Sequence, residues 1–283
     1  MRSVRIVTDS NADVPPNIAS ELGIAVVPNY IYFGQEVIRD GIDLTPQAFF
    51  GKMAGSPCHP RTTHPPVSEF VGTYQQLMNG SGADAIISIH VASTVSGTVN
   101  AAWAAAQMLP NPSQVEIIDS GQLSMGLGWV VIKAAELANG GASRTEVVEA
   151  VKSLLPRLRV VAMIDTLDNL VRGGRISQLS ASLGTLLQVK PLLTMRSGQV
   201  SILGRVRTRA RALSRLVEQV QGWGPLAGLA VMHAGAEERA RTLAEAFSGI
   251  AGPRMLIAPA GAALTTHLGL GAVGVCGLMA GGE

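Results

Sequence analysis

Short apolar runs alternate with helix-start signals through the first half of the chain, and this alternation limits the possible folds more than any other feature. Four runs, at residues 4–8, 25–32, 86–91 and 115–118, have the length and apolar content of buried strands. Pro15-Pro16 and Thr45-Pro46 have the form of helix starts, and residues 98–108 and 144–155 are further predicted helices. Strands that alternate with helices predict a parallel, doubly wound α/β sheet.

The second half of the chain follows a different pattern. The apolar runs LLTM and VSIL flank residues 196–199, which is typical of a hairpin. Arginines at positions 205, 207, 209 and 211 would share one face of an extended strand, as a solvated face or as the approach to a helix. We therefore expect an N-terminal parallel α/β domain, residues 1–158, and a C-terminal mixed α/β domain, residues 159–283, with the Gly-rich tail returning to a site between them.

Composition and charge narrow the function classes. A chain of 283 residues is long enough for two such domains. The formal net charge of +2 gives no reason to expect a nucleic-acid partner. Cys58 and Cys276 are too few and too far apart for a disulfide framework, and with no signal peptide at the N-terminus we expect a cytoplasmic protein. Residues 255–282 carry no charged side chain, but their many glycines and Pro259 are unlike a membrane helix, so we expect no stable membrane insertion.

A cluster of hydroxyl residues follows the predicted strand at 86–91. Ser93, Ser96 and Gly97 lie directly before the helix that begins near Thr98. Three interpretations fit this turn: a nucleophilic serine, an anion site at the helix start, or an ordinary capped turn. The anion site fits better than the nucleophile, because the free backbone N–H groups and serine hydroxyls suit a phosphate or carboxylate.

Two further loops carry polar side chains that could hold a ligand. Thr62 lies in the stretch RTTHPP, and Thr266 and His267 precede the glycines of residues 269–274. The latter match G-x-G-x-x-G, but only nine residues follow Gly274, too few for a dinucleotide-binding unit. His267 could hold a carboxylate or serve as a hydrogen-bonded structural residue. Cys58, His59 and His64, which lie close to Thr62 in the sequence, do not match any metal-ligand spacing, so we expect no metal.

Three strand ends repeat one pattern. Residues 7–10, 117–120 and 163–166 each end an apolar run with Asp followed by a hydroxyl residue. If the strands are parallel, these groups gather at the carboxyl edge of the sheet, where open α/β proteins bind ligands. In the alternative interpretation, each Asp caps the turn or helix that follows.

Taken together, these motifs resemble the DegV family of bacterial proteins across nearly the whole chain. VTDSNADVP at residues 7–15 is similar to the family's opening, and RTTHP at 61–65 stands where the family has a Thr-Ser-Gln-Pro element. STVSGT, IIDSGQLSMGLG, LDNLVRGGRIS, VKPLL and THLGLGAVG resemble later family blocks in the family order. His64, Ala92, Leu268 and Leu270 depart from the usual family residues.

The resemblance implies a two-domain protein that binds one long-chain fatty acid between its domains and is not itself catalytic, with no cofactor. It implies that the carboxylate is held by Thr62, by Ser93 or Ser96 with Gly97, and by His267 beside Thr266. It also implies that the protein presents this carboxylate to a separate fatty acid kinase subunit, in phospholipid metabolism. Arg172 and Arg175 are candidates for docking that partner, or for capping a loop or pairing with Asp168. The apolar residues 179–193 are candidates for lining the acyl tunnel.

Two other functions stay open on the residues alone. One is an enzyme, either a hydrolase that uses Ser96 and His267 or a metal-dependent phosphotransferase that uses Asp9 and Asp119. The other is a regulatory protein whose arginine-rich segment RVRTRAR binds nucleic acid, with salt-sensitive affinity.

Overall fold

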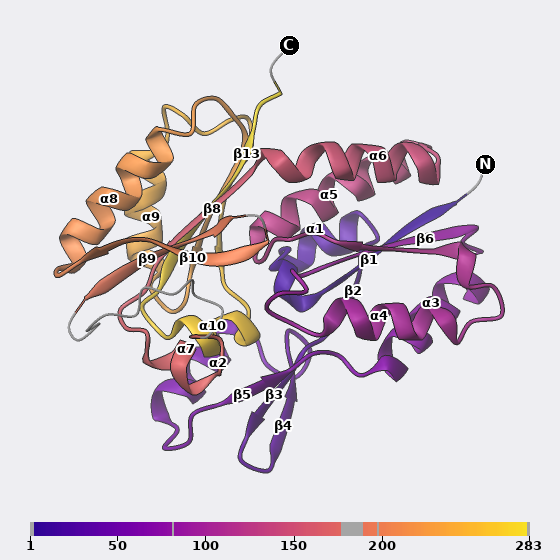
Figure 1. Ribbon diagram of the computed structural model, residues 1–283, viewed down its shortest axis with the longest axis horizontal. Coiled ribbons are helices and arrows are strands. Elements are labelled where there is room, and N and C mark those ends of the chain that lie inside the picture. The colour runs from indigo at the N-terminus through magenta and orange to yellow at the C-terminus, as the bar shows by residue number, and fades with distance from the viewer. Residues whose placement is uncertain (1–2, 81, 177–188, 197, 282–283) are drawn as a thin grey trace. The chain divides into compact units, whose positions relative to one another are not determined.

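Four parallel strands form the sheet of the first half of the chain, as the alternating pattern predicts. The computed structural model describes residues 3–80, 82–176, 189–196 and 198–281 (Figure 1). The strand order in this sheet is β2-β1-β6-β7, and every neighbouring pair is parallel. β6 is buried at all of its residues. The strands are β1 (Val4–Asp9), β2 (Ala25–Val27), β6 (Ala85–His90) and β7 (Val115–Asp119).

Helices cover both faces of this parallel sheet (Figure 1). On one face, Phe70 and Tyr74 of α3 and the alanines of α4 pack on Val7 and Ile86. The mostly apolar α5 lies on the other face, and α6 packs against it and begins with a capping box at Ser143. The helices that accompany this parallel sheet are α1 (Pro16–Glu21), α3 (Val67–Gly80), α4 (Thr98–Gln107), α5 (Met125–Asn139) and α6 (Arg144–Leu154).

The predicted strand at residues 25–32 is two strands that belong to different sheets. β2 ends at Val27, and Tyr30–Phe33 is β3 of a small sheet with order β4-β3-β5. Pro28 lies between them and has no N–H group to continue a ladder. The other strands of the small sheet are β4 (Glu36–Arg39) and β5 (Arg61–Thr63).

The mixed sheet of the second half has six strands in the order β10-β9-β8-β13-β11-β12. β11 and β12 are parallel, and the other pairs are antiparallel. The predicted hairpin at residues 196–199 is confirmed, with Gly198 at a φ of 76°. The strands are β8 (Leu158–Met163), β9 (Lys190–Arg196), β10 (Gln199–Val206), β11 (Leu226–His233), β12 (Met255–Pro259) and β13 (Val273–Met279).

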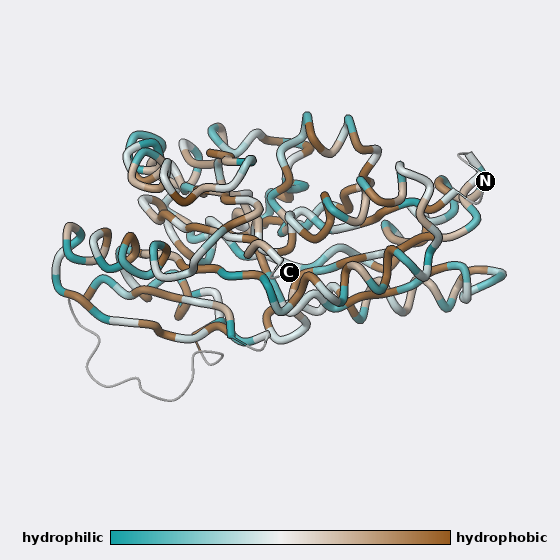
Figure 2. The backbone as a smooth tube through the Cα atoms, turned by 90° about the horizontal axis from the view of Figure 1, so that it is seen from above, coloured by the Kyte–Doolittle hydropathy of each residue, from teal (hydrophilic) through white to brown (hydrophobic). Residues whose placement is uncertain are grey.

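The two faces of the mixed sheet are covered by different elements. Leu192 belongs to one buried apolar cluster, together with residues of α8 (Arg209–Gln221) and α9 (Glu237–Ala246). Its neighbour Leu193 belongs to a second buried apolar cluster. Consecutive strand residues point to opposite faces, so these clusters lie on opposite sides of the sheet. The second cluster includes Phe33 and Phe49, from β3 and α2 (Pro46–Gly55). Figure 2 shows hydrophobic residues along the strands and recurring on the helices.

The Gly-rich tail becomes a central strand of the mixed sheet. β13 lies between β8 and β11, and a Cβ atom on Gly277 would stand 2.8 Å from the Trp223 ring. A glycine at this position therefore lets an indole pack directly on the strand backbone.

The arginine-rich segment is not one extended strand. Arg205 lies in β10, whereas Arg209 and Arg211 lie in α8, whose first turn is capped by Thr208. The expectation of four charges on one strand face is wrong, because the helix begins inside the segment. The alternative, an approach to a helix, describes it.

The chain forms two compact units. The first consists of Met1–Tyr30 and Thr63–Pro156, and the second of Ile31–Thr62 and Arg157–Glu283. The α/β class, with a parallel and a mixed sheet, is confirmed. Two independent domains with one boundary after residue 158 stay a prediction, from which the compact units differ by the segment Ile31–Thr62. Within the described ranges, no helix is both long and apolar enough to cross a bilayer.

Candidate functional site

Thr62 and His267 come together in the second unit, although 205 positions separate them in sequence. Thr62 lies in β5, and His267 lies in the last turn of α10 (Ala262–Leu268), not in a loop as the sequence suggested. The Thr62 Oγ1 and His267 Nε2 atoms are 2.8 Å apart, which is a hydrogen bond. Two residues chosen from the sequence as carboxylate ligands therefore form one polar pair.

The start of α10 is held by a carboxylate that sequence reasoning missed. Asp40 is 5% exposed and accepts hydrogen bonds from the backbone N–H groups of Ala262 (3.0 Å) and Ala263 (3.1 Å). These are orphan donors of a helix start, so Asp40 fixes the helix that carries His267. The fully buried Thr266 donates its hydroxyl to the Ala262 carbonyl, which commits that proton to the helix backbone.

Gly173 leaves the space that the His267 ring occupies. A Cβ atom at position 173 would stand 2.3 Å from His267 Nδ1, far inside van der Waals contact. Gly173 is the C-cap of α7 (Asp168–Arg172), in the RGGR stretch that sequence analysis noted for its arginines. The close approach of ring and backbone explains why a glycine stands here.

The His267 ring is neutral at pH 7. Burial, helped by the charge of Arg175 and by His59, lowers the pKa of His267 to about 4. Its Nδ1 atom has no hydrogen-bond partner among the described residues. A buried N–H without a partner is rarer and costlier than a bare acceptor, so we place the proton on Nε2. Nε2 then donates to Thr62 Oγ1, and the Thr62 hydroxyl proton is left to donate to a ligand.

The charge of Arg175 acts on this pair, and the charge of Arg172 acts on the neighbouring His59. Arg175 donates from Nη1 to the Gly173 carbonyl at 2.8 Å. Burial, with the charge of Arg172 nearby, lowers the pKa of His59. The second unit thus combines an uncharged hydroxyl donor with positive potential, which suits an anion.

The serine turn belongs to the first unit and follows β6. The exposed Ser93 donates its backbone N–H to the Asp119 carboxylate, at 3.3 Å to each oxygen. Ser96 Oγ lies 2.8 Å from Thr98 Oγ1. A Cβ atom on Gly97 would meet the His64 ring at 3.0 Å, so the backbone passes close to that ring.

The structure therefore places the predicted carboxylate ligands in two groups. Thr62, Thr266 and His267, with Arg172 and Arg175 as neighbours, lie in the second unit, and Ser93, Ser96 and Gly97 lie in the first. Their convergence on one ligand stays a prediction. Of the predicted tunnel residues 179–193, those at 179–188 lie outside the described residues.

The repeated Asp-hydroxyl strand ends gather only in part. Asp9 and Asp119 lie at the carboxyl ends of β1 and β7, on either side of β6. Asp165 follows β8 in the other unit, where it pairs with Lys190 (3.2 Å) and Arg209 (2.5 Å). Within the part of the chain that the structure describes, no group of three or more His, Cys, Asp or Glu side chains could hold a metal ion.

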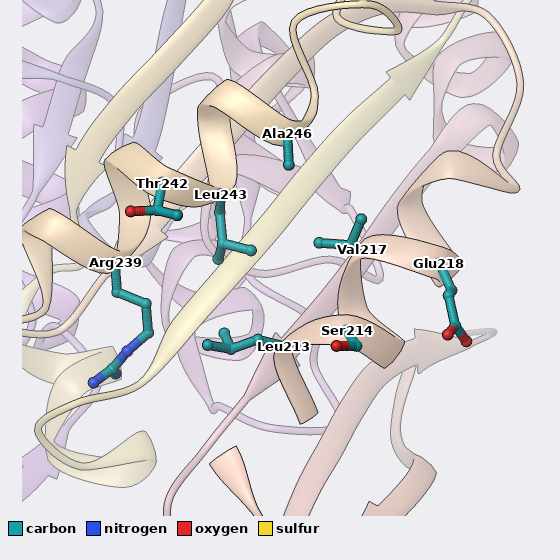
Figure 3. Close-up of a pocket in the computed structure, with 8 residues that line it drawn as sticks. All are labelled: Leu213, Ser214, Val217, Glu218, Arg239, Thr242, Leu243 and Ala246. Atoms are coloured by element: carbon teal, nitrogen blue, oxygen red, sulfur yellow. The ribbon is translucent and has the colours of Figure 1, made fainter. Parts of the chain in front are cut away.

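A groove of about 620 Å³ separates α8 from α9 in the second unit (Figure 3). Leu213, Val217 and Leu243 form its apolar middle, and Arg239 and Glu218 extend at its two sides. It contains none of the residues predicted from the sequence to bind a ligand.

The parallel sheet and the mixed sheet define a two-sheet α/β protein, and its second unit carries the hydroxyl-imidazole pair of Thr62 and His267. The chain belongs to the DegV family: the family model described as "Uncharacterised protein, DegV family" matches residues 3–279. A DegV domain-containing protein of Deinococcus radiodurans is 36% identical over 279 residues, which cover 96% of this chain and 97% of that protein.

Two solved structures of the family share the fold. The fatty acid binding protein DegV from Bacillus subtilis has a TM-score of 0.90 and 33% identity, covering 99% of this chain and 100% of that one. A DegV family protein from Thermus thermophilus, described by its fatty acid binding, has a TM-score of 0.88 and 31% identity, covering 98% and 100%. Both relatives are thus described as binding fatty acids.

Proposed function

We propose that this protein binds one long-chain fatty acid and that Thr62 and His267 hold its carboxylate. The observation that carries the proposal is the 2.8 Å contact between Thr62 Oγ1 and the neutral His267 ring. With the proton on Nε2, the ring orients the threonine so that its O–H points to a ligand oxygen. Both solved relatives are described as binding fatty acids, which supports the class of ligand.

The acyl tail would supply most of the affinity. Burial of a methylene contributes about 0.8 kcal/mol, so a tail of about sixteen carbons outweighs any single head-group hydrogen bond. The head group would then decide orientation and select acids over uncharged lipids. Ser93, Ser96 and Gly97 would add donors to the same carboxylate, in a tunnel between the domains.

A carrier role in the cytoplasm completes the proposal. The protein would present its bound carboxylate to a separate fatty acid kinase subunit, which performs the chemistry in phospholipid metabolism, and would have no catalytic activity or cofactor of its own. Arg172, at the exposed end of α7, and the neighbouring Arg175 are the proposed docking residues. Their positive charge suits an acidic partner surface.

Equilibrium binding of palmitate and of the matching alcohol, 1-hexadecanol, tests the head-group assignment. We expect the wild-type protein to prefer the acid, and Thr62→Val to weaken palmitate binding about three- to ten-fold by removing one hydrogen bond. Thr62→Ser keeps the hydroxyl and serves as the matched control, with near-wild-type binding. Equal affinities for acid and alcohol in the wild-type protein would refute the assignment.

A further inference from the structure

Four fully buried polar side chains form a continuous chain of hydrogen bonds through the first unit. Tyr74, Ser88, His90 and Asp9 are each 0% exposed. Tyr74 Oη lies 2.9 Å from Ser88 Oγ, and Ser88 Oγ lies 2.7 Å from His90 Nε2. His90 Nδ1 lies 3.0 Å from Asp9 Oδ2. The proposed head-group contacts use none of these side chains.

One arrangement of protons lets every member of this chain donate to the next. Burial alone would raise the pKa of Asp9, but its hydrogen bond to and electrostatic interaction with His90, together with hydrogen bonds from Val91 and Asn11, outweigh burial and keep the pKa below the usual value. Asp9 is thus an ionised acceptor. Burial raises the pKa of Tyr74, which stays a donor. With the His90 proton on Nδ1, Tyr74 donates to Ser88, Ser88 to His90, and His90 to Asp9.

The Asp-His-Ser order is that of a hydrolytic triad, but Ser88 is not placed to act as a nucleophile. It is fully buried under α3, and its oxygen already contacts the Tyr74 hydroxyl. The His90 ring also packs nearly perpendicular to the Phe70 ring, with centroids 5.1 Å apart. A substrate carbonyl cannot approach the Ser88 oxygen, so this chain of hydrogen bonds has another role.

That role follows from the peptide unit that lies at the Asp9 end of these hydrogen bonds. Asp9 Oδ2 accepts the Val91 N–H at 3.1 Å, and the His90 carbonyl accepts the Ser120 N–H (3.1 Å) and hydroxyl (2.6 Å). This N–H and this carbonyl belong to the same peptide unit. Side chains therefore fix both polar groups of the peptide that opens the serine turn, two residues before Ser93.

We propose that Asp9, His90, Ser88 and Tyr74 are positioning residues that hold the turn at Ser93–Gly97 in the geometry that binds a carboxylate. This inference rests on the proposed function and extends it to residues that never touch the ligand. Loss of these buried hydrogen bonds loosens the turn at Ser93–Gly97 and weakens recognition of the ligand's carboxylate. Binding of the acyl tail is unchanged.

The test compares dissociation constants for palmitate and 1-hexadecanol in full-length variants. Ser88→Ala breaks the chain, Tyr74→Phe removes its first donor, and Ser88→Thr restores the hydroxyl. Ser143→Ala, which removes the α6 cap in the same unit, controls for general loss of stability. We expect the preference for acid over alcohol to fall about three-fold or more in Ser88→Ala, less in Tyr74→Phe, and to return in Ser88→Thr. Ser143→Ala should keep the wild-type preference.

Hydrogen exchange at residues 91–97 provides a second readout, with faster exchange expected in Ser88→Ala than in Ser143→Ala. An unchanged preference in Ser88→Ala, or an equal weakening of both ligands, would overturn the inference. If the wild-type protein binds no palmitate, or if Thr62→Val has no effect, the proposed function fails instead. The two failures are therefore distinguishable.

Discussion

At the scale of single residues, the Thr62–His267 pair depends on what surrounds it more than on its own chemistry. Gly173 leaves room for the ring, and burial keeps the ring neutral. Sequence analysis selected Thr62 and His267 through their family motifs. It missed the role of Gly173, because the need for a glycine there arises only when the ring of His267, 94 positions later (267 − 173), packs against it.

Replacement of Gly173 by alanine should displace the His267 ring. The added Cβ atom would stand 2.3 Å from Nδ1, so the ring must move and its contact with Thr62 must lengthen. We expect palmitate affinity to fall about three- to ten-fold, the effect of losing one hydrogen bond. Gly51→Ala is the matched control, because nothing lies within 4 Å of its added Cβ. Equal affinities of the two variants, measured by titration calorimetry, would contradict this role of Gly173.

The neutral His267 should make stability depend on pH. Its folded pKa of about 4 lies below the ordinary 6.5, so the unfolded chain takes up a proton between these values that the folded chain does not. The folded protein therefore has the full contribution of the neutral ring to its stability above pH 6.5. It loses about 3 kcal/mol of unfolding free energy from this source as the pH falls toward 4. His267→Gln should lose less stability over this range in urea unfolding. Parallel pH profiles for the two proteins would show that the ring is not held neutral.

At the scale of elements, local patterns predicted the strands well, and long-range contacts limited what else could be predicted. The strands at 4–8, 86–91 and 115–118 and the Thr45 cap, which accepts the Ala48 N–H, are present as expected. The placement of α10 could not be predicted, because its cap, Asp40, lies 222 positions before Ala262.

Asp40 should therefore matter more than the nearby Asp43. Asp40→Asn leaves a buried amide that can accept only one of the two helix N–H groups, and we expect a loss of about 1–2 kcal/mol of unfolding free energy. Asp43 pairs with Arg39 on the surface, so Asp43→Asn should have a much smaller effect. Chemical denaturation measures both. Equal losses of stability in the two variants would show that Asp40 does not hold the start of α10.

At the scale of the whole molecule, each of the two units contains a buried apolar cluster of its own. Residues 31–62 lie in the first half of the sequence, yet Phe33 and Phe49 join the core of the second unit. A contiguous division after residue 158 follows the switch from parallel to antiparallel patterning. It cannot detect a segment that leaves one unit and packs in another, because no local pattern records the partner of an apolar side chain.

A substitution in β13 should show that residues 31–62 belong to the core of the second unit. Gly277→Ala would place a Cβ atom 2.8 Å from the Trp223 ring, and such overpacking typically destabilises by about 1–3 kcal/mol. We expect hydrogen exchange to accelerate in residues 157–279 and also in 31–62, while residues 3–30 and 63–156 stay protected. If residues 31–62 instead keep the protection of the first unit, they do not belong to the second core.

Mass spectrometry of organic-solvent extracts from natively purified protein tests whether this protein carries a fatty acid. We predict close to one long-chain fatty acid per chain, and a smaller amount in a Thr62→Val, His267→Gln double variant that still folds. The absence of fatty acid from the wild-type protein, even after incubation with excess palmitate and oleate, would show that this protein is not a fatty-acid carrier.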